Sequence, residues 1–215
     1  MNYGLRYEYY SVLHEDRNLF TFFDMNTGNL DFNPNRRWYG SSKLNFGPRL
    51  AFTWAPNRFG GNTVFRIGAG YYYGPGQTED QMQTIDSDRV TMTQTNNIAF
   101  PVNSQAIINS FDLSNFKGFS PRVYAPGYTL PEKVLSYTAS VQQRLPFDTV
   151  LTAAYVGSQG RDLFLRSWTN LMTGVTMDPN TGAGIPVLQF GNAFSQLDYK
   201  TSGGTDHYDS LQVTA

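Results

Sequence analysis

The sequence predicts an all-β fold: an antiparallel transmembrane β-barrel segment of about six strands, with long extracellular loops alternating with short periplasmic turns. Three observations support this prediction. Apolar and polar residues alternate in six stretches, the connections between those stretches alternate in length, and most charged residues of the strands fall on the polar faces. Strands of a membrane barrel have this pattern because successive side chains point to lipid and to the lumen.

The composition is unusual for a protein surface that faces water. Aromatic and charged residues each make up 15% of the 215 residues, whereas soluble surfaces are normally rich in charge. The formal net charge of -1 gives no basic excess for nucleic acid. The absence of cysteine excludes disulfides and thiolate metal sites, and no apolar run reaches the length of a transmembrane helix.

The first three strands are expected within residues 2–10, 45–54 and 63–74. Each alternates at period two, which gives it one apolar and one polar face. Pro48 cannot donate a ladder hydrogen bond, so firm pairing of the second strand is expected to begin after it. The apolar faces contain, in chain order, Tyr3, Leu5, Tyr7 and Tyr9; Phe46, Leu50, Phe52 and Trp54; and Phe65, Ile67, Tyr71 and Tyr73.

The last three strands are expected within residues 134–145, 149–157 and 207–215. The fourth and sixth strands alternate clearly, whereas the fifth has a weaker apolar face. Their apolar faces contain Leu135, Tyr137, Ala139, Val141 and Leu145; Leu151, Ala153 and Tyr155; and Leu211, Val213 and Ala215.

The connections differ strongly in length. Residues 11–44, 75–132 and 158–206 form long connections, whereas residues 55–62 and 146–148 form short ones. Structureless loops of such length would be unusual in a compact soluble domain. Outer-membrane barrels have long extracellular loops and short periplasmic turns, so the alternation favours a barrel.

The charged residues of the strands are predicted to face the lumen. An Arg that faces lipid at the bilayer midplane costs about 2–4 kcal/mol, which selects against that orientation. Lys133 and Asp209 would face outward, but each lies at the loop end of its strand. A soluble sheet with one wet face would also place arginines on its polar side, so this alternative stays open. The predicted lumen-facing residues are Arg6, Glu8, Arg49, Arg66 and Arg144.

Amphipathic aromatic residues gather near the predicted strand ends. Rings of this kind form girdles at both interfaces of membrane barrels. In a soluble sandwich the same residues would be ordinary core or surface aromatics. The predicted outer-interface residues are Tyr7, Tyr9, Tyr71, Tyr73 and Tyr155, and Trp54 is predicted at the inner interface.

Several motifs resemble the barrel of TonB-dependent outer-membrane receptors. They are "YGLRYEYYS", "NFGPRLAFTWAP", "TVFRIGAGYYYG", "YTASVQQRLPFDTVLTAAYVGSQGRDLF" and "HYDSLQVTA". The resemblance is greatest to the Oar-like group, whose chains often begin with a carboxypeptidase-regulatory-like domain. It spans nearly the whole chain and keeps the order of the motifs.

The resemblance implies a larger receptor. A complete member has a barrel of about 22 strands, a plug and a TonB box. We therefore expect residues 1–215 to be a partial TonB-dependent receptor β-barrel domain, with the plug, the TonB box and the remaining strands absent. The implied location is the cell outer membrane of a Gram-negative-type bacterium. The implied partners are outer-membrane lipid, an unknown solute, and the TonB complex through the missing parts; no nucleic acid and no cofactor are expected.

The resemblance also implies a function in transport. The full receptor would take up a large or scarce solute through a gated β-barrel, without breaking a bond, so we expect no enzyme and name no catalytic residue. Two alternatives remain open. One is a soluble all-β carbohydrate-binding module, and the other is an outer-membrane adhesin or hydrolase that acts through its loops.

The long connection after the third strand contains candidate ligand contacts. Aromatic rings at a barrel mouth could stack on sugar rings or hold an apolar ligand, although self-packing of a long loop explains them equally well. These candidates are Phe111, Phe116, Phe119, Tyr124 and Tyr128.

Other motifs favour structural interpretations. His207 lies between Asp206 and Asp209, which is weak evidence for a metal site. "DMNTGNLDF" lacks the register of a calcium loop, and together with "DPNTGAG" it predicts two turns of the same kind. Gly68 and Gly70 lack the spacing of a dinucleotide loop and instead predict close packing on the lumenal wall.

Overall fold

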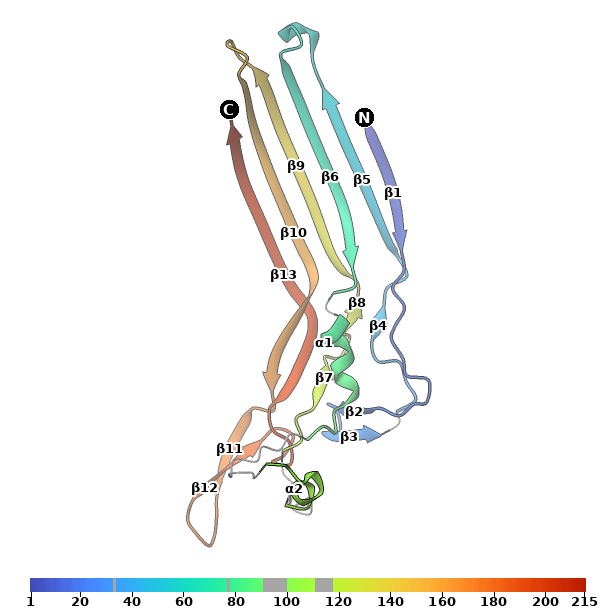
Figure 1. Cartoon of the computed structure of the whole chain (residues 1–215), viewed down its shortest axis with the longest axis vertical. Coiled ribbons are helices and arrows are strands. Elements are labelled where there is room, and N and C mark those ends of the chain that lie inside the picture. The colour runs from blue at the N-terminus through green and yellow to red at the C-terminus, as the bar shows by residue number, and fades with distance from the viewer. Residues whose placement is uncertain (33, 77, 91–99, 111–117) are drawn as a thin grey trace.

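The computed structural model describes residues 1–32, 34–76, 78–90, 100–110 and 118–215. Long antiparallel strands stand side by side in one sheet (Figure 1), in the order β1-β5-β6-β9-β10-β13, and β7 joins the far side of β13. This arrangement confirms the all-β prediction. The long strands are β1 (Asn2–Glu8), β5 (Asn45–Trp54), β6 (Thr63–Gly74), β9 (Glu132–Arg144), β10 (Val150–Thr169) and β13 (Leu197–Thr214).

The strand register aligns the apolar faces into one surface. Directly opposite residues of an antiparallel pair share a face. One continuous row runs across five strands, through Phe52, Ile67, Ala139, Tyr155 and Leu211. The row beside it is small or polar except at Val156 and contains Ala51, Gly68, Thr138, Val156 and Ser210. The two faces of the sheet therefore differ in polarity over its whole width.

The short turns lie at one end of the sheet and the long connections at the other (Figure 1). The first turn contains the short helix η1 (Asn57–Phe59) and closes with Gly60 in the left-handed conformation, at φ 62°. The second turn has Phe147 and Asp148 at positive φ, and the Leu145 amide donates to the Thr149 carbonyl over 2.9 Å. Both short connections were predicted from the sequence.

The expected lengths of the fifth and sixth strands were wrong. Strand β10 continues past Gly157 to Thr169, and β13 begins at Leu197 rather than at His207. Their pairing shifts register between Gly160 and Leu163 and again between Leu163 and Leu165. A bulge breaks the period-two pattern, which is why the alternation ended early in the sequence. The first strand was also shorter than expected, because β1 ends at Glu8.

The long connections fold together into a second region, which we call the loop body: residues 10–44, 75–131 and 161–205, as far as they are described. Figure 1 shows it below the sheet, joined to it by the extensions of β10 and β13. Its helices are α1 (Thr78–Met82), η2 (Gln83–Ile85) and α2 (Ser104–Ser110). Its further strands are β2 (Thr21–Asp24), β3 (Asn29–Phe32), β4 (Gly40–Ser41), β7 (Arg122–Tyr124), β8 (Thr129–Leu130), β11 (Met172–Met177) and β12 (Gly184–Leu188).

Within the described ranges, the buried hydrophobic side chains all lie in the loop body. Phe20 and Phe22 pack edge to face, with 4.9 Å between ring centroids, and the Phe20 ring lies 5.7 Å from the Trp38 ring. A smaller cluster unites Phe23, Val123 and Leu197. None of the helices described is long and apolar enough to cross a membrane. The larger cluster contains Phe20, Phe22, Trp38, Tyr39, Tyr128 and Leu130.

Candidate functional site

The predicted girdle residues lie on the apolar face of the sheet, with one exception. Tyr7 is paired with Phe46 near the loop body, and Trp54 is stacked on Phe65 near the short turns, with ring centroids 5.1 Å and 5.5 Å apart. Tyr71 and Tyr73 are on the same face of β6, and Tyr155 is on the same face of β10. Their contact with lipid remains a prediction.

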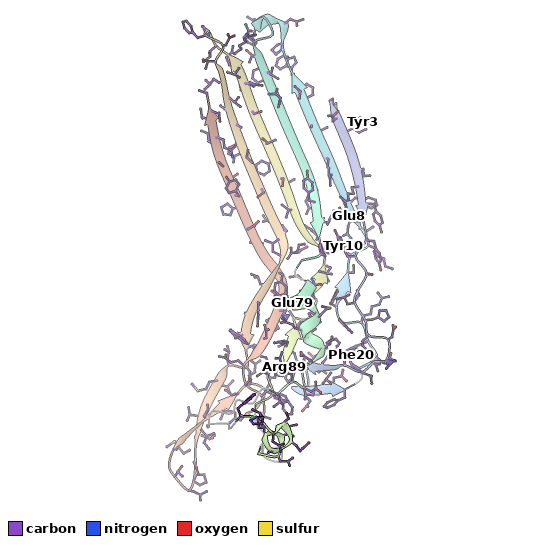
Figure 2. The ribbon with its side chains drawn as sticks, in the orientation of Figure 1. Tyr3, Glu8, Tyr10, Phe20, Glu79 and Arg89 are labelled. Atoms are coloured by element: carbon purple, nitrogen blue, oxygen red, sulfur yellow. The ribbon has the colours of Figure 1, made fainter. Side chains whose placement is uncertain are left out.

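Tyr9 is the exception among these residues. It follows the end of β1 and lines a cavity of about 560 Å³ in the loop body, together with Phe20 and Arg36. The strand does not extend to Tyr9, so strand alternation does not fix the direction of its side chain. Figure 2 shows that Glu8 and Tyr10, its two neighbours, lie where the sheet meets the loop body.

The predicted lumen-facing charges lie on the opposite face. Arg6 forms an ion pair with Glu8, with Nε 2.8 Å from Oε1. The Arg49 guanidinium lies 4.5 Å from the Tyr72 ring centroid, a cation–π distance. Arg66 and Arg144 donate to Gln142 and Asp148 over 2.8 Å and 2.9 Å. The structure gives these charges polar or aromatic partners; whether they line a lumen remains a prediction.

Two charged residues lie on the apolar face, and both have partners. Lys133 is at the loop-body end of β9, whereas Asp209 lies within β13 in the row of Gly157, Tyr137 and Ala69, so its expected position at the beginning of its strand was wrong. Asp209 accepts hydrogen bonds from the Tyr137 and Tyr155 hydroxyls at 2.9 Å and 2.6 Å. Lys133 forms an ion pair with Asp162. Such partners offset part of the cost of a charge on an apolar face.

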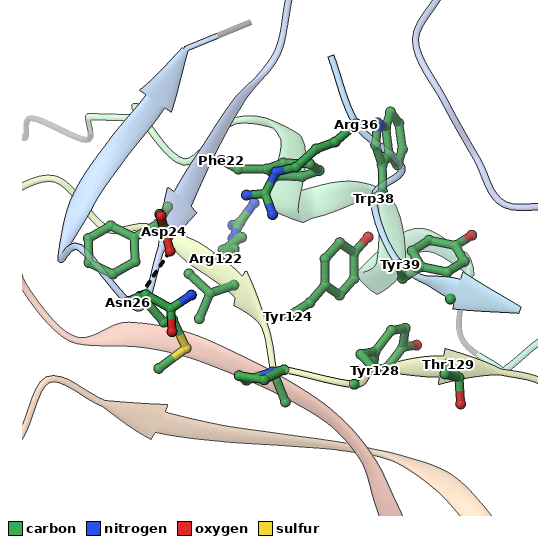
Figure 3. Close-up of a pocket in the computed structure, with 17 residues that line it drawn as sticks. Phe22, Asp24, Asn26, Arg36, Trp38, Tyr39, Arg122, Tyr124, Tyr128 and Thr129 are labelled. Carbon is green, nitrogen blue, oxygen red and sulfur yellow. Dashed lines mark hydrogen bonds between the residues drawn. The ribbon is translucent and has the colours of Figure 1, made fainter. Parts of the chain in front are cut away.

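The loop body contains an aromatic pocket of about 300 Å³ (Figure 3). Tyr124 and Tyr128 stack at 5.0 Å between ring centroids, and Tyr39 meets both edge to face. Arg36 lies over the Phe22 ring at 5.0 Å and supplies a positive charge to the same wall. Aromatic surfaces beside charged and amide groups suit an organic ligand with rings and polar substituents.

Burial affects the ionisation of this tyrosine cluster. Desolvation raises the pKa of Tyr128, and its hydrogen bond with Gln81 lowers that pKa by a smaller amount, so the pKa is about 12. Desolvation also raises the pKa values of Tyr39 and Tyr124. All three hydroxyls are therefore neutral at ordinary pH and can donate or accept hydrogen bonds.

An ionic cluster connects α1 and η2 to β13. The Lys200 ammonium is fully buried and donates to Asp80 and Gln83, each over 3.2 Å. Asp198 lies beside it and pairs with Arg166, whose Nε donates to Oδ1 over 2.8 Å and whose Nη2 lies 2.8 Å from Oδ2. Burying these charges is tolerable only because each finds opposite charge and hydrogen bonds.

The predicted loop aromatics lie in different places. Tyr124 and Tyr128 line the aromatic pocket and also pack within the loop body, so both sequence interpretations fit them. Phe119 forms an isolated β-bridge with Phe194, whose ring lies 6.1 Å away. Phe111 and Phe116 lie outside the described residues.

Sequence reasoning missed several residues of the site. Arg36, Trp38 and Tyr39 lie in the run "RRWYG", which combines charge with aromatic rings and lacks the alternation of a strand. That combination could have indicated a binding residue. Arg122, Arg166 and Lys200 gave no signal, because their importance depends on contacts between distant segments. His, Asp and Glu side chains of the described ranges form no group of three or more that could hold a metal ion.

Comparison with known protein families identifies the chain. The family model of the outer membrane beta barrel domain matches residues 1–215. The chain belongs to this family. No curated protein and no solved structure matches it. This outer membrane β-barrel domain therefore lies in the outer membrane, and its alternating strands are barrel strands. That location leaves the soluble carbohydrate-binding module without support.

Proposed function

We propose that this domain forms part of the barrel of a TonB-dependent transporter that takes up a large or scarce solute. Motifs similar to those receptors support the proposal, as does membership of an outer-membrane barrel family. The observation that carries it is the union of a two-faced strand sheet with a folded loop body that contains cavities at one end. A plain structural barrel has no need of such a loop body.

Each region would have its own part in transport. The apolar sheet face would contact lipid, and the face with Arg6, Arg49 and Arg66 would border the solute path. Gly68 and Gly70 border a depression of about 330 Å³ with Ser136 and Thr138, which offers room for an inner segment to pack closely. The loop body would capture the solute before passage. The solute would be bound and released without any bond being broken.

Energy would come from the inner-membrane TonB complex, reached through segments of the full receptor other than this domain. The experiment compares cells that express the full-length protein with a deletion strain, each with and without TonB. Uptake is measured for a panel of labelled scarce solutes. We expect at least one solute to accumulate only when both the receptor and TonB are present.

Two other outcomes would count against TonB-dependent transport. Uptake that persists without TonB would indicate a passive pore. Cell attachment lost in the deletion strain, with uptake unchanged for the whole panel, would instead favour the adhesin.

A further inference from the structure

A third cavity of the loop body, of about 340 Å³, is lined by three arginines, and we call it the arginine pocket. Arg89 follows η2, Arg122 begins β7, and Arg166 lies in the extension of β10. Segments far apart in the chain thus bring three guanidinium groups to one cavity. Its remaining lining residues are Ser120, Trp168, Ser195, Gln196 and Asp198.

Charge is unbalanced around this pocket. The basic groups are the three arginines and buried Lys200, and their carboxylate partners within the described ranges are Asp80, Asp86 and Asp198. Each of the four basic groups has at least one ion pair, but four cations share three carboxylates, so this set carries a net charge of +1. A bound anion would neutralise it.

The hydrogen-bonding capacity of the arginines is unevenly used. Arg166 is occupied, because its contacts with Asp198 are short and bidentate. The ion pairs of Arg122 in the described ranges are longer than hydrogen bonds: 3.6 Å to Asp86 and 3.9 Å to Asp198. The ion pair of Arg89 with Asp86 is also 3.9 Å long. The Arg122 side chain is 23% exposed, so part of it is accessible at the cavity surface.

The geometry favours an oxyanion as the ligand. A guanidinium presents its donors in a planar fork that matches carboxylate and phosphate oxygens. The Ser120 and Ser195 hydroxyls also line the cavity; they lie 2.6 Å apart, and Ser195 donates to the Phe119 carbonyl over 3.1 Å. A cation is disfavoured, because the only carboxylate that lines the described cavity is Asp198, which is 4% exposed and already held by Arg166.

Arg122 also lines the aromatic pocket, so the two cavities share one residue. Figure 3 shows Arg122 among the residues that line the aromatic pocket, with Phe22 and Asp24, and Figure 2 places Arg89 in the loop body. We propose that the arginine pocket binds a carboxylate or phosphate group of the captured solute, whose ring-bearing part occupies the aromatic pocket. This inference rests on the proposed transport function and narrows the solute to an acidic compound.

The test measures binding to the purified full-length protein in a detergent that contains no sugar. Isothermal titration calorimetry compares glucose with glucuronate and glucose 6-phosphate, which add a carboxylate and a phosphate to one ring. We expect at least one acid to bind about tenfold or more tightly than glucose, the scale of a charge-assisted hydrogen bond. Its affinity should fall as salt rises.

Variants locate the binding. Arg122→Gln should weaken the acid by about tenfold or more, and Arg122→Lys should recover part of the loss because it keeps the charge without the fork. The matched control is Arg144→Gln, which removes an arginine paired with Asp148 at the short turns and should change nothing. Heat-modifiable migration on gels confirms that each variant has assembled.

Three results would overturn the inference. They are equal affinity for glucose and its acids, no binding of any probe, and unchanged acid binding by an Arg122→Gln variant that has assembled. Binding of lipopolysaccharide micelles alone would also overturn it, because the anion would then belong to a lipid headgroup. The two proposals fail separately. Uptake that needs TonB but ignores Arg122→Gln refutes only the pocket, whereas acid binding without TonB-dependent uptake refutes only transport.

Discussion

The sheet and the loop body place the same kinds of residue in opposite surroundings. On the sheet, the Ile67 and Leu211 side chains are 59% and 73% exposed, because no other layer of the described residues packs over them. In the loop body, Phe22 and Leu197 are 4% and 0% exposed. The loop body has the buried core of a water-soluble fold, whereas the sheet has an apolar surface that is stable in hydrocarbon. The loop body is thus suited to water and the apolar face of the sheet to lipid.

The polar groups follow the same division. The sheet charges are paired along the surface, as Arg66 is with Gln142. The loop body instead buries Lys200 among carboxylates. We therefore expect the loop body to depend on a few specific interactions, and the sheet to depend on backbone pairing and on which face meets lipid.

The largest effect should come from breaking the ionic cluster. Lys200→Met leaves Asp80 without its shortest ion pair and removes one of the cations around Asp198. Loss of one partner from a buried pair costs about 3–5 kcal/mol. We expect faster hydrogen exchange of the β7 and β13 amides near Lys200 in the full-length protein, with unchanged exchange in β5 and β6.

The control for this change is Arg58→Met, in an exposed position of η1. It also exchanges a cation for methionine but should leave the loop body unaffected. If exchange in the strands rises as much as in the loop body, the two regions are not independent in stability.

The next effect tests the sheet. Ile67→Arg places a charge on the apolar face, at a cost of about 2–4 kcal/mol if that face meets the bilayer core. Its neighbour Gly68 is on the other face, where an added Cβ would meet Thr138 Cγ2 at an ordinary 3.5 Å. We expect Ile67→Arg to reduce the heat-modifiable form of the full-length protein strongly, and Gly68→Ser to reduce it little. Equal losses would contradict the assigned faces.

Alkaline pH should affect the loop body first. A tyrosine with an unfolded pKa near 10 and a folded pKa of about 12, as for Tyr128, stabilises the fold below pH 10. That contribution is lost as the pH rises from about 10 through 12, because only the unfolded form ionises readily there. We expect the near-ultraviolet circular dichroism of the loop tyrosines to disappear in this range, before the far-ultraviolet strand signal. Simultaneous loss would argue against a separate loop-body transition.

The smallest expected effect compares two similar turns of the loop body. Gly28 and Gly182 both have left-handed conformations, at φ 69° and 68°, and each donates its amide to an aspartate carbonyl four residues earlier over 2.8 Å. Alanine in this conformation costs about 1 kcal/mol. Gly28→Ala and Gly182→Ala should therefore cost similar amounts in thermal unfolding of the loop body, because Phe190 Cδ1, at 3.4 Å from the added Cβ at Gly28, is at an ordinary contact distance and nothing lies within 4 Å of the Cβ at Gly182. A much larger cost at Gly28 would mean that the Phe190 ring cannot accept the added methyl group.

The difference between the regions also explains what the sequence could predict. Strand alternation is local, so it located all six long strands and placed Arg66 and Ile67 on different faces. The repeated "NTG" predicted two like turns, whose backbone hydrogen bonds the structure confirms. The contact of Lys200 with Asp80 spans 120 positions, and no local pattern encodes it. The arginine pocket could not be predicted for the same reason.

The most direct test of the two-solvent description is the accessibility of single spin labels along β6 and β13. The chain has no cysteine, so labels can be introduced at Ile67, Gly68, Leu211 and Gln212 in a cysteine-free full-length protein in bilayers. We predict that labels at Ile67 and Leu211 collide mainly with oxygen dissolved in lipid. Labels at Gly68 and Gln212 should favour a water-soluble nickel reagent or be shielded from both. The absence of alternation, or its reverse, would contradict the assignment of the apolar face to lipid.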